Sequence, residues 1–203
     1  MTPMRTFIAL PLPQAAREHL VEVQQELARR VPRKAALRWT DPENLHLTLK
    51  FLGYVDPERV PELEALVEAA AAPFSPMDTT LGHVSAFASP RRARVVVAHF
   101  SHPAELLELA ALVERLAGPL GFPPETRPFV AHITLARLRQ PMDLASALEP
   151  FPPLELPIHL SELVLFESRL TPTRAFYRPI TTRTLGSPPS HRDQSPPNTS
   201  ERA

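Results

Sequence analysis

Residues 45–53 read LHLTLKFLG, and the interpretation of the whole chain starts from this stretch. Successive side chains of a β-strand point to opposite faces of its sheet. The pattern therefore predicts a strand with His46 and Thr48 on one face and leucines on the other. We expect the leucine face to join the hydrophobic core and the polar face to be available for chemistry.

The same pattern returns at residues 131–137, AHITLAR, where it places His132 and Thr134 on one face. A single strand histidine is more often structural than catalytic, but a repeated histidine-threonine pattern favours a function. The segments around both copies follow one order: strand, helix, connector, histidine-threonine strand, helix, strand. This order predicts an internal duplication, approximately residues 5–87 and 93–180, within a single bilobal domain of residues 1–184. A pseudo-twofold axis would bring the two histidine-threonine strands face to face.

Hydrophobic periodicity and turn residues predict the remaining elements. Strands are expected at residues 5–10, 77–87, 94–98, 160–166 and 175–180, and helices at 14–30, 57–72, 103–117 and 144–148. Residues 185–203 are rich in Ser, Pro, Asn and charge and show no apolar periodicity. We expect them to form a disordered, dispensable polar tail.

Composition limits the classes of function. A chain of 203 residues with 43% hydrophobic content can bury a sizeable core, and its formal net charge of zero provides no uniform basic field for long nucleic acids. Any RNA partner should therefore be held locally, at an end. The absence of cysteine excludes disulfides and thiolate zinc sites. The early apolar run at 7–12 is too short for a membrane span, so we expect a cytoplasmic protein, and a monomer, that does not bind membranes.

Two histidines and two threonines on facing strands suit the chemistry of a phosphodiester. Histidine titrates near neutral pH, so one ring can act as a general base while the other acts as a general acid. Each threonine hydroxyl can hydrogen-bond a non-bridging oxygen of a phosphate held between the rings. Water would attack phosphorus on the side opposite the leaving oxygen. The residues alone do not say which histidine has which role.

The chain resembles the 2H phosphoesterase superfamily, and within it the bacterial and archaeal RNA 2′,3′-cyclic phosphodiesterases, also called 2′-5′ RNA ligases. The resemblance is carried by residues 7–11, FIALP, by 43–53, ENLHLTLKFLG, by 128–137, PFVAHITLAR, and by 165–170, LFESRL. It implies an α+β fold of two pseudosymmetric lobes, each an antiparallel sheet with helices on its outer face, around a central groove. It also implies metal-independent hydrolysis of 2′,3′-cyclic phosphate ends of RNA, or of small cyclic nucleotides, to 2′-phosphates without a cofactor.

The resemblance also implies roles for single residues. His46 would donate a proton to the departing 3′ oxygen, and His132 would be the base for water. Thr48 and Thr134 would bind phosphate oxygens, and Arg137 would contact substrate. Strict alternation places Arg137 on the core face, so its role requires a β-bulge or the end of the strand. Lys50 is expected on the His46 face, either adding positive charge to the groove or simply facing solvent.

Other functions compete with this hypothesis. A binding module could hold RNA ends in the same groove without hydrolysing them, although binding alone would accept Lys or Arg in place of the histidines. A metal site is a second rival, but two histidines without a nearby acid or cysteine form a poor ligand set. A related enzyme could act on another cyclic phosphate or on 2′-5′ oligonucleotides, and the reaction could run backward as 2′-5′ ligation.

Overall fold

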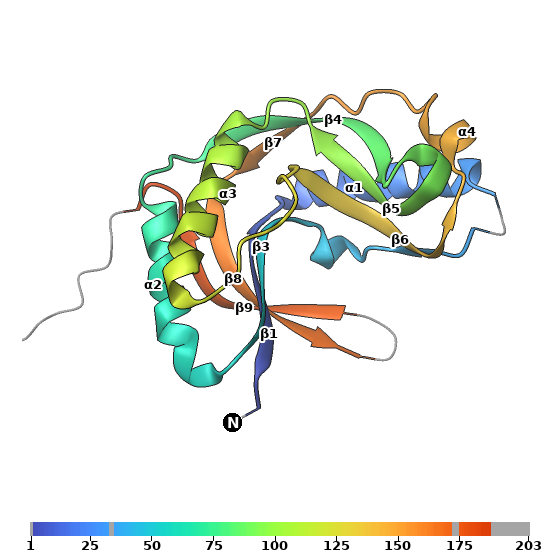
Figure 1. Ribbon diagram of the computed structural model, residues 1–203. Helices are drawn as coiled ribbons and strands as arrows, with labels where there is room; N and C mark the ends of the chain where they lie inside the picture. Colours follow the sequence, from blue (N-terminus) through green and yellow to red (C-terminus); the bar gives the residue numbers. More distant parts are fainter. Residues whose placement is uncertain (1, 33–34, 172–174, 188–203) are drawn as a thin grey trace, which may run out of the picture.

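The computed structural model describes residues 2–32, 35–171 and 175–187, and their strands form two antiparallel sheets (Figure 1). The first sheet contains, in spatial order, β3 (His46–Val55), β1 (Met4–Pro11), β8 (Glu162–Leu170) and β9 (Ala175–Thr184). The second contains β2 (Leu37–Trp39), β6 (His132–Met142), β5 (Ala93–Phe100), β4 (Met77–Phe87) and β7 (Leu156–Leu160). The expected α+β architecture with two antiparallel sheets is confirmed.

Each sheet takes strands from both halves of the chain. β4, from the first half, pairs with β5 and β7 in the second sheet, whereas β8 and β9 return to the first sheet. β1, from the first half, is an interior strand of the first sheet: it pairs with β3 on one edge and with β8, from the second half, on the other. Its residues 6–10 are buried throughout. The two sheets therefore do not coincide with the contiguous segments 5–87 and 93–180. The duplication itself stays a prediction.

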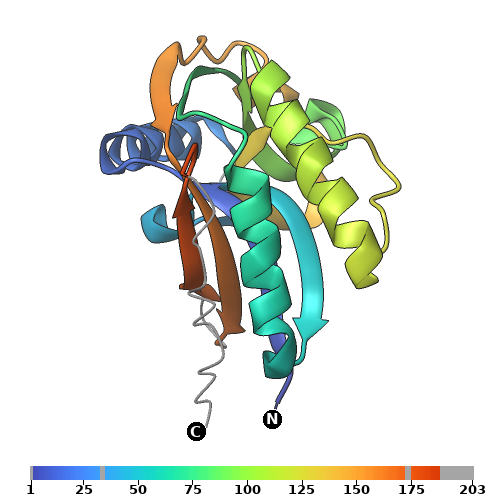
Figure 2. The same cartoon turned by 90° about the vertical axis from the view of Figure 1, so that its left-hand side faces the viewer.

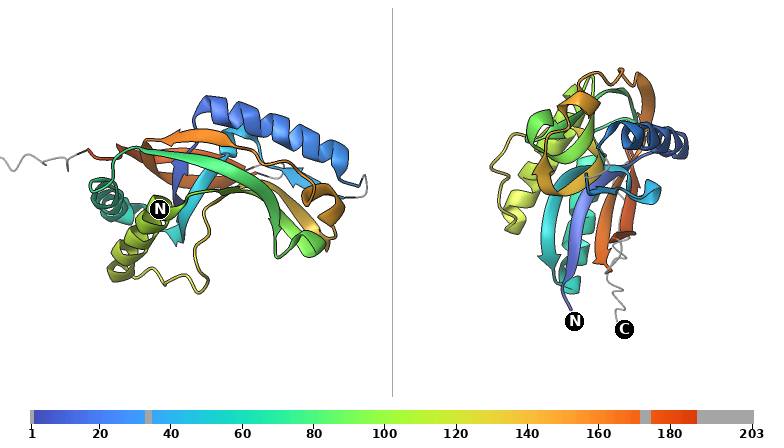
Figure 3. Two further views of the ribbon diagram at one scale, coloured as in Figure 1. Left: turned by 90° about the horizontal axis from the view of Figure 1, so that it is seen from above. Right: turned by 90° about the vertical axis from the view of Figure 1, so that its right-hand side faces the viewer.

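The helices divide between the two sheets. α1 (Gln14–Arg30) contacts β7 of the second sheet and α4 (Ala145–Leu148), and Figure 3 shows α1 lying along that sheet. α2 (Val60–Ala71) contacts β8 and β9 of the first sheet, and α3 (Ala104–Ala117) contacts β3 and α2. Figure 2 shows α2 and α3 together on one side of the molecule. These helices bury apolar stripes, such as Leu20 and Leu27 of α1, because their apolar residues recur at helical spacing.

The structure corrects two expected boundaries near the end of the chain. The single strand expected at 160–166 is two strands, β7 and β8, which are separated at Ser161. The Ser161 carbonyl accepts a hydrogen bond from the Leu185 N–H at 2.9 Å, and Leu185 is 3% exposed. A tail beginning at residue 185 is therefore wrong, since Leu185 belongs to the core. Residues 188–203 of the expected tail lie outside the described residues.

Candidate active site

The two histidine-threonine pairs begin β3 and β6 and occupy equivalent positions. In each strand the His and the Thr are half-buried, and the apolar residues on either side of the Thr are buried. The burial pattern is the same over the first six residues of both strands: half-buried, buried, half-buried, buried, buried, exposed. The alternation expected at the start of each strand is therefore present, and it changes at the fifth residue in both.

A β-bulge causes that change. β3 has one residue more than β1 between the pairs Ile8–Lys50 and Ala9–Thr48. β6 has the same extra residue relative to β5, between the pairs Val96–Ala136 and Val97–Thr134. An extra residue reverses the alternation beyond it, because two residues of one strand then oppose one residue of the other. The register of both strands is thus shifted directly after the threonine.

The bulge in β6 turns Arg137 away from the core. Arg137 is exposed, and it lines a cavity of about 540 Å³ together with Phe7, Phe51 and Tyr177. The bulge required for a substrate contact by Arg137 is present. Gln24 of α1 stabilises the bulge, since its side-chain amide donates a buried hydrogen bond of 3.0 Å to the Leu135 carbonyl.

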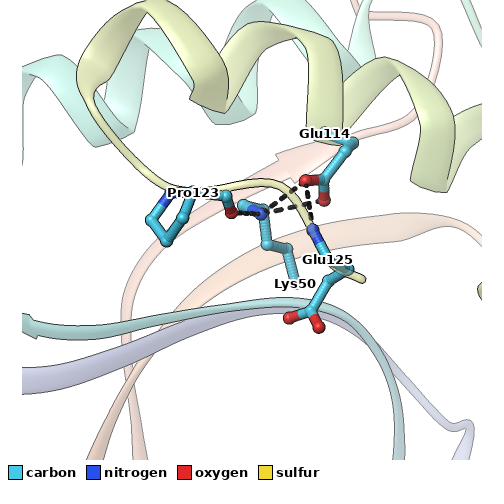
Figure 4. Close-up of polar contacts among 4 residues, drawn as sticks. All are labelled: Lys50, Glu114, Pro123 and Glu125. Carbon is cyan, nitrogen blue, oxygen red and sulfur yellow. Dashed lines mark hydrogen bonds and ion pairs between the residues drawn. The ribbon is translucent and has the colours of Figure 1, made fainter. Parts of the chain in front are cut away.

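The bulge in β3 moves Lys50 in the opposite sense. Lys50 was expected on the His46 face, but its side chain is only 1% exposed, and its ammonium donates to both Glu114 carboxylate oxygens at 2.8 Å (Figure 4). It also donates to the Pro123 carbonyl at 3.0 Å. Both interpretations of Lys50 are wrong, because the fifth residue of the strand faces inward after the bulge. The ion pair connects β3 to α3. The hydrogen bond to Pro123 connects β3 to the segment between α3 and β6.

Both histidines are held by the same hydrogen bond. Nδ1 of His46 lies 2.7 Å from the Asn44 carbonyl, and Nδ1 of His132 lies 2.7 Å from the Val130 carbonyl. A carbonyl oxygen can only accept, so Nδ1 carries the hydrogen in both rings and Nε2 is left for other partners. In His46 this nitrogen lies 2.9 Å from the Thr48 hydroxyl, which donates to it when the ring is neutral. Both rings thus keep Nε2 for proton transfer.

Aromatic rings surround His46. Phe7 and Tyr177 lie with ring centroids 5.0 and 5.2 Å from the His46 ring, and Tyr177 meets it edge to face at 85°. On the other side of the site, Phe87 meets His132 edge to face at 4.9 Å and 88°. These contacts were not expected from the sequence. They join residues of β1, β9 and β4 to the two motifs, so only the pairing of the strands brings them together.

Burial lowers the pKa of both histidines. The pKa of His46 falls from 6.5 to about 4, mainly because the ring is buried, although its hydrogen bond to Asn44 opposes the change. The pKa of His132 is also lowered, again mainly by burial. The positive charge of Arg137 lowers both pKa values further, and a charge on His132 lowers that of His46. The two rings are therefore coupled, and protonation of one opposes protonation of the other.

A third histidine borders the site. His99 of β5 pairs directly with His132 across the sheet, and its ring stacks on that of His83 with centroids 4.6 Å apart. Burial and the charges of these two neighbours lower the pKa of His99 from 6.5 to about 4. The sequence offered no sign of this contact, because His83 and His99 belong to no motif.

Neither a metal cluster nor a membrane-spanning helix is found within residues 2–32, 35–171 and 175–187. In this part of the chain, no three His, Cys, Asp or Glu side chains come together as a candidate metal site. None of the helices there is long and apolar enough to cross a membrane.

Comparison with known proteins identifies relatives that match most of the chain. The family described as LigT like Phosphoesterase matches residues 10–97 and 101–177. The RNA 2′,3′-cyclic phosphodiesterase of Methanothermobacter thermautotrophicus is 29% identical over 178 residues, which cover 86% of this chain and 95% of that protein. The enzyme of the same name from Archaeoglobus fulgidus is 31% identical over 137 residues, covering 68% of this chain and 74% of the relative.

Solved structures agree with these matches. A crystal structure of a Thermus thermophilus protein superposes with a TM-score of 0.76 at 29% identity, covering 90% of this chain and 98% of that chain. The crystal structure of Escherichia coli LigT complexed with 3′-AMP superposes with a TM-score of 0.75 at 29% identity, covering 91% and 99%. The arrangement of the two antiparallel sheets is therefore shared with solved proteins.

Proposed function

This chain belongs to the family of LigT-like phosphoesterases, and we propose on that premise that it hydrolyses 2′,3′-cyclic phosphodiester ends of RNA to 2′-phosphomonoesters, without a metal ion. Relatives that match most of the chain are named RNA 2′,3′-cyclic phosphodiesterase. The observation that supports the mechanism best is the shared geometry of the two motifs. Each histidine donates from Nδ1 to the carbonyl two residues earlier and keeps Nε2 for proton transfer.

The reaction needs one base and one acid. Nε2 of His132 takes a proton from water, whose oxygen forms a bond to phosphorus opposite the 3′ oxygen. The bond from phosphorus to the 3′ oxygen breaks, and Nε2 of His46 donates a proton to that oxygen. The products are a 2′-phosphate and a 3′ hydroxyl. His132 ends protonated and His46 neutral, and exchange with solvent restores the starting state.

The threonines and Arg137 bind the phosphate in this proposal. Without substrate, the Thr48 hydroxyl lies 2.9 Å from Nε2 of His46. Turning that hydroxyl to a phosphate oxygen releases Nε2 for the leaving group. Thr134, in the equivalent position on β6, binds a second oxygen, and the guanidinium of Arg137 neutralises charge that develops on the phosphoryl group.

Substrate binding raises the pKa of the acid, which then takes up its proton from solvent. The pKa of His46 is about 4 in the free protein, so the ring is neutral at pH 7. A bound phosphate anion stabilises the imidazolium form and raises the pKa of a nearby histidine. One ring of the pair is then protonated, while their mutual repulsion keeps the other neutral.

The test is hydrolysis of 2′,3′-cyclic nucleotides and of cyclic-phosphate-ended RNA in the presence of a chelator, with the position of the product phosphate determined. His46→Ala and His132→Ala should each lower kcat by about 10²- to 10⁴-fold. The double variant should lose far less than the product of the two effects, because residues that act as a unit are not additive. His159→Ala is the control, since His159 is an exposed partner of Asp78.

The alternatives give different results in the same assay. A binding module would hold RNA ends without turnover, and a metal enzyme would stop when the chelator is added. A related activity on 2′-5′ oligonucleotides, or reverse ligation, would give turnover with other substrates and the same dependence on His46 and His132. The expected cytoplasmic location and monomeric state stay predictions.

A further inference from the structure

Two arginines lie directly opposite each other at one end of the second sheet. β2 is an edge strand of three residues, and its Arg38 pairs with Arg137 of β6. Side chains of directly paired residues project from the same face of a sheet. Both arginines are exposed, and both line the cavity that is also lined by Phe7 and Tyr177, the ring neighbours of His46.

The lining of this cavity contains more basic than acidic residues. The same cavity is also lined by Arg5, and Asp41 is the one acidic residue among its lining residues in the described part of the chain. The formal net charge of the chain is zero, so this excess of positive charge is local. Clefts that concentrate one sign of charge attract ligands of the opposite sign.

A single cyclic phosphate carries less negative charge than the three arginines of the cavity lining carry positive charge. The charge of Arg137 lowers the pKa of both histidines, and in the proposed function Arg137 binds the reacting phosphate. Arg38 is on the edge strand β2, one strand farther from the centre of the sheet than Arg137. A nucleoside 2′,3′-cyclic phosphate has one negative charge, whereas a nucleotide within a chain has a second phosphate on its 5′ oxygen.

Aromatic side chains line the wall of the same cavity. Phe51, at the position of β3 that is equivalent to Arg137 in β6, is 51% exposed, and Tyr177 and Trp39 also line the cavity. A large exposed aromatic side chain provides a face on which a nucleobase can stack. The cavity thus combines stacking surfaces for a base with positive charge beyond the reacting phosphate.

We propose that Arg38, together with Arg137, binds a second phosphate, the one on the 5′ oxygen of the nucleoside that carries the cyclic phosphate. The proposal rests on the proposed function and narrows its substrate class. The protein prefers ends that have a 5′ phosphoryl group, either an internucleotide phosphodiester or a terminal 5′ phosphate, to free nucleoside 2′,3′-cyclic phosphates.

The experiment compares three substrates with one reacting group. They are adenosine 2′,3′-cyclic phosphate, the same compound with a 5′ phosphate, and the dinucleotide ApA with a terminal 2′,3′-cyclic phosphate. The wild-type protein should hydrolyse the second and third with higher kcat/KM than the first. Arg38→Gln should lower kcat/KM for those two by about 10- to 100-fold, the range of a charge-assisted hydrogen bond, and leave the first within about twofold.

Two further variants separate charge from folding. Arg38→Lys keeps the charge but loses the planar fork of the guanidinium, so its kcat/KM should lie between those of the wild type and Arg38→Gln. Arg115→Gln removes one positive charge from an exposed position of α3 outside the cavity lining, and all three substrates should react as with the wild type. Circular dichroism and thermal unfolding show whether each variant is folded.

Salt dependence gives an independent readout. Salt screens an exposed ion pair between a guanidinium and a phosphate. Arg38→Gln should therefore make kcat/KM for the dinucleotide fall less steeply with salt concentration, and leave the salt dependence for adenosine 2′,3′-cyclic phosphate unchanged. If Arg38→Gln lowers kcat/KM equally for all three substrates, or for none, the second phosphate site is wrong. If the wild-type protein hydrolyses none of them, the proposed function itself is wrong.

Discussion

The ion pair of Lys50 and Glu114 should respond unequally to removal of its two partners. The Lys50 side chain is 1% exposed and that of Glu114 is 30% exposed. Glu114→Leu leaves a buried ammonium that still donates to the Pro123 carbonyl at 3.0 Å but has lost its counter-charge. An uncompensated buried charge costs about 3–5 kcal/mol, so this variant should lose about that much unfolding free energy.

Lys50→Met should cost less. It leaves the Glu114 carboxylate, which reaches solvent and keeps the hydrogen bond from the Glu125 N–H at 3.0 Å. Methionine also fills the volume of the lysine stem with apolar atoms. We expect a loss of about 1–2 kcal/mol, the cost of a hydrogen-bonded charged group that keeps other partners.

The double variant tests the reasoning. Lys50→Met with Glu114→Leu removes both charges and leaves no buried ion without a partner, and such replacements are often close to neutral. It should therefore be more stable than Glu114→Leu alone by about 3–5 kcal/mol. The measurement is urea unfolding of all four proteins, with equal slopes required before free energies are compared. If Glu114→Leu costs no more than Lys50→Met, or if the two losses simply add, the account of a buried, uncompensated ammonium is refuted.

Three further predictions concern pH and the bulge. Arg137→Gln removes a charge that lowers the pKa of His46 and of His132. If these histidines act as proposed, the acid limb of kcat/KM against pH should move to higher pH, and an unmoved limb would contradict the effect of Arg137 on their pKa values. The pKa values of His46 and His99 are lowered from 6.5 to about 4 in the folded protein. The unfolded chain therefore binds these protons more tightly, and the free energy of unfolding should fall as pH is lowered from about 6.5 to about 4. His99→Gln should make unfolding free energy less dependent on pH in that window, as followed by urea unfolding at several pH values. Gln24→Met removes two hydrogen bonds to backbone carbonyls, one of them at the bulge in β6, and should cost about 1–3 kcal/mol by thermal or urea unfolding. Gln14→Met on the exposed side of the same helix should change stability by less than about 0.5 kcal/mol.

The local features of the two motifs were predictable from the sequence. His46 and Thr48 share a face, as do His132 and Thr134, because alternation is a property of any extended chain and needs no knowledge of neighbouring strands. The helix at Gln14–Arg30 was equally accessible, since its apolar residues recur at helical spacing within the segment itself. The resemblance carried by the same motifs also led to the fold of two antiparallel sheets.

Other features depend on pairing between segments that are distant in the chain. A one-residue bulge in β6 exposes Arg137, and a second one in β3 buries Lys50. A bulge is a mismatch in residue number between paired strands, so neither strand shows it alone. Tyr177 reaches His46 because β8 and β9 return to the first sheet. Leu185 is buried because it hydrogen-bonds at Ser161, although its surroundings in the sequence are polar. The sequence by itself determined which residues share a face of each histidine strand, because side-chain alternation is a local property of one strand. Only the tertiary structure decided what lies opposite them, because strand register depends on pairing between two segments that are distant in the chain.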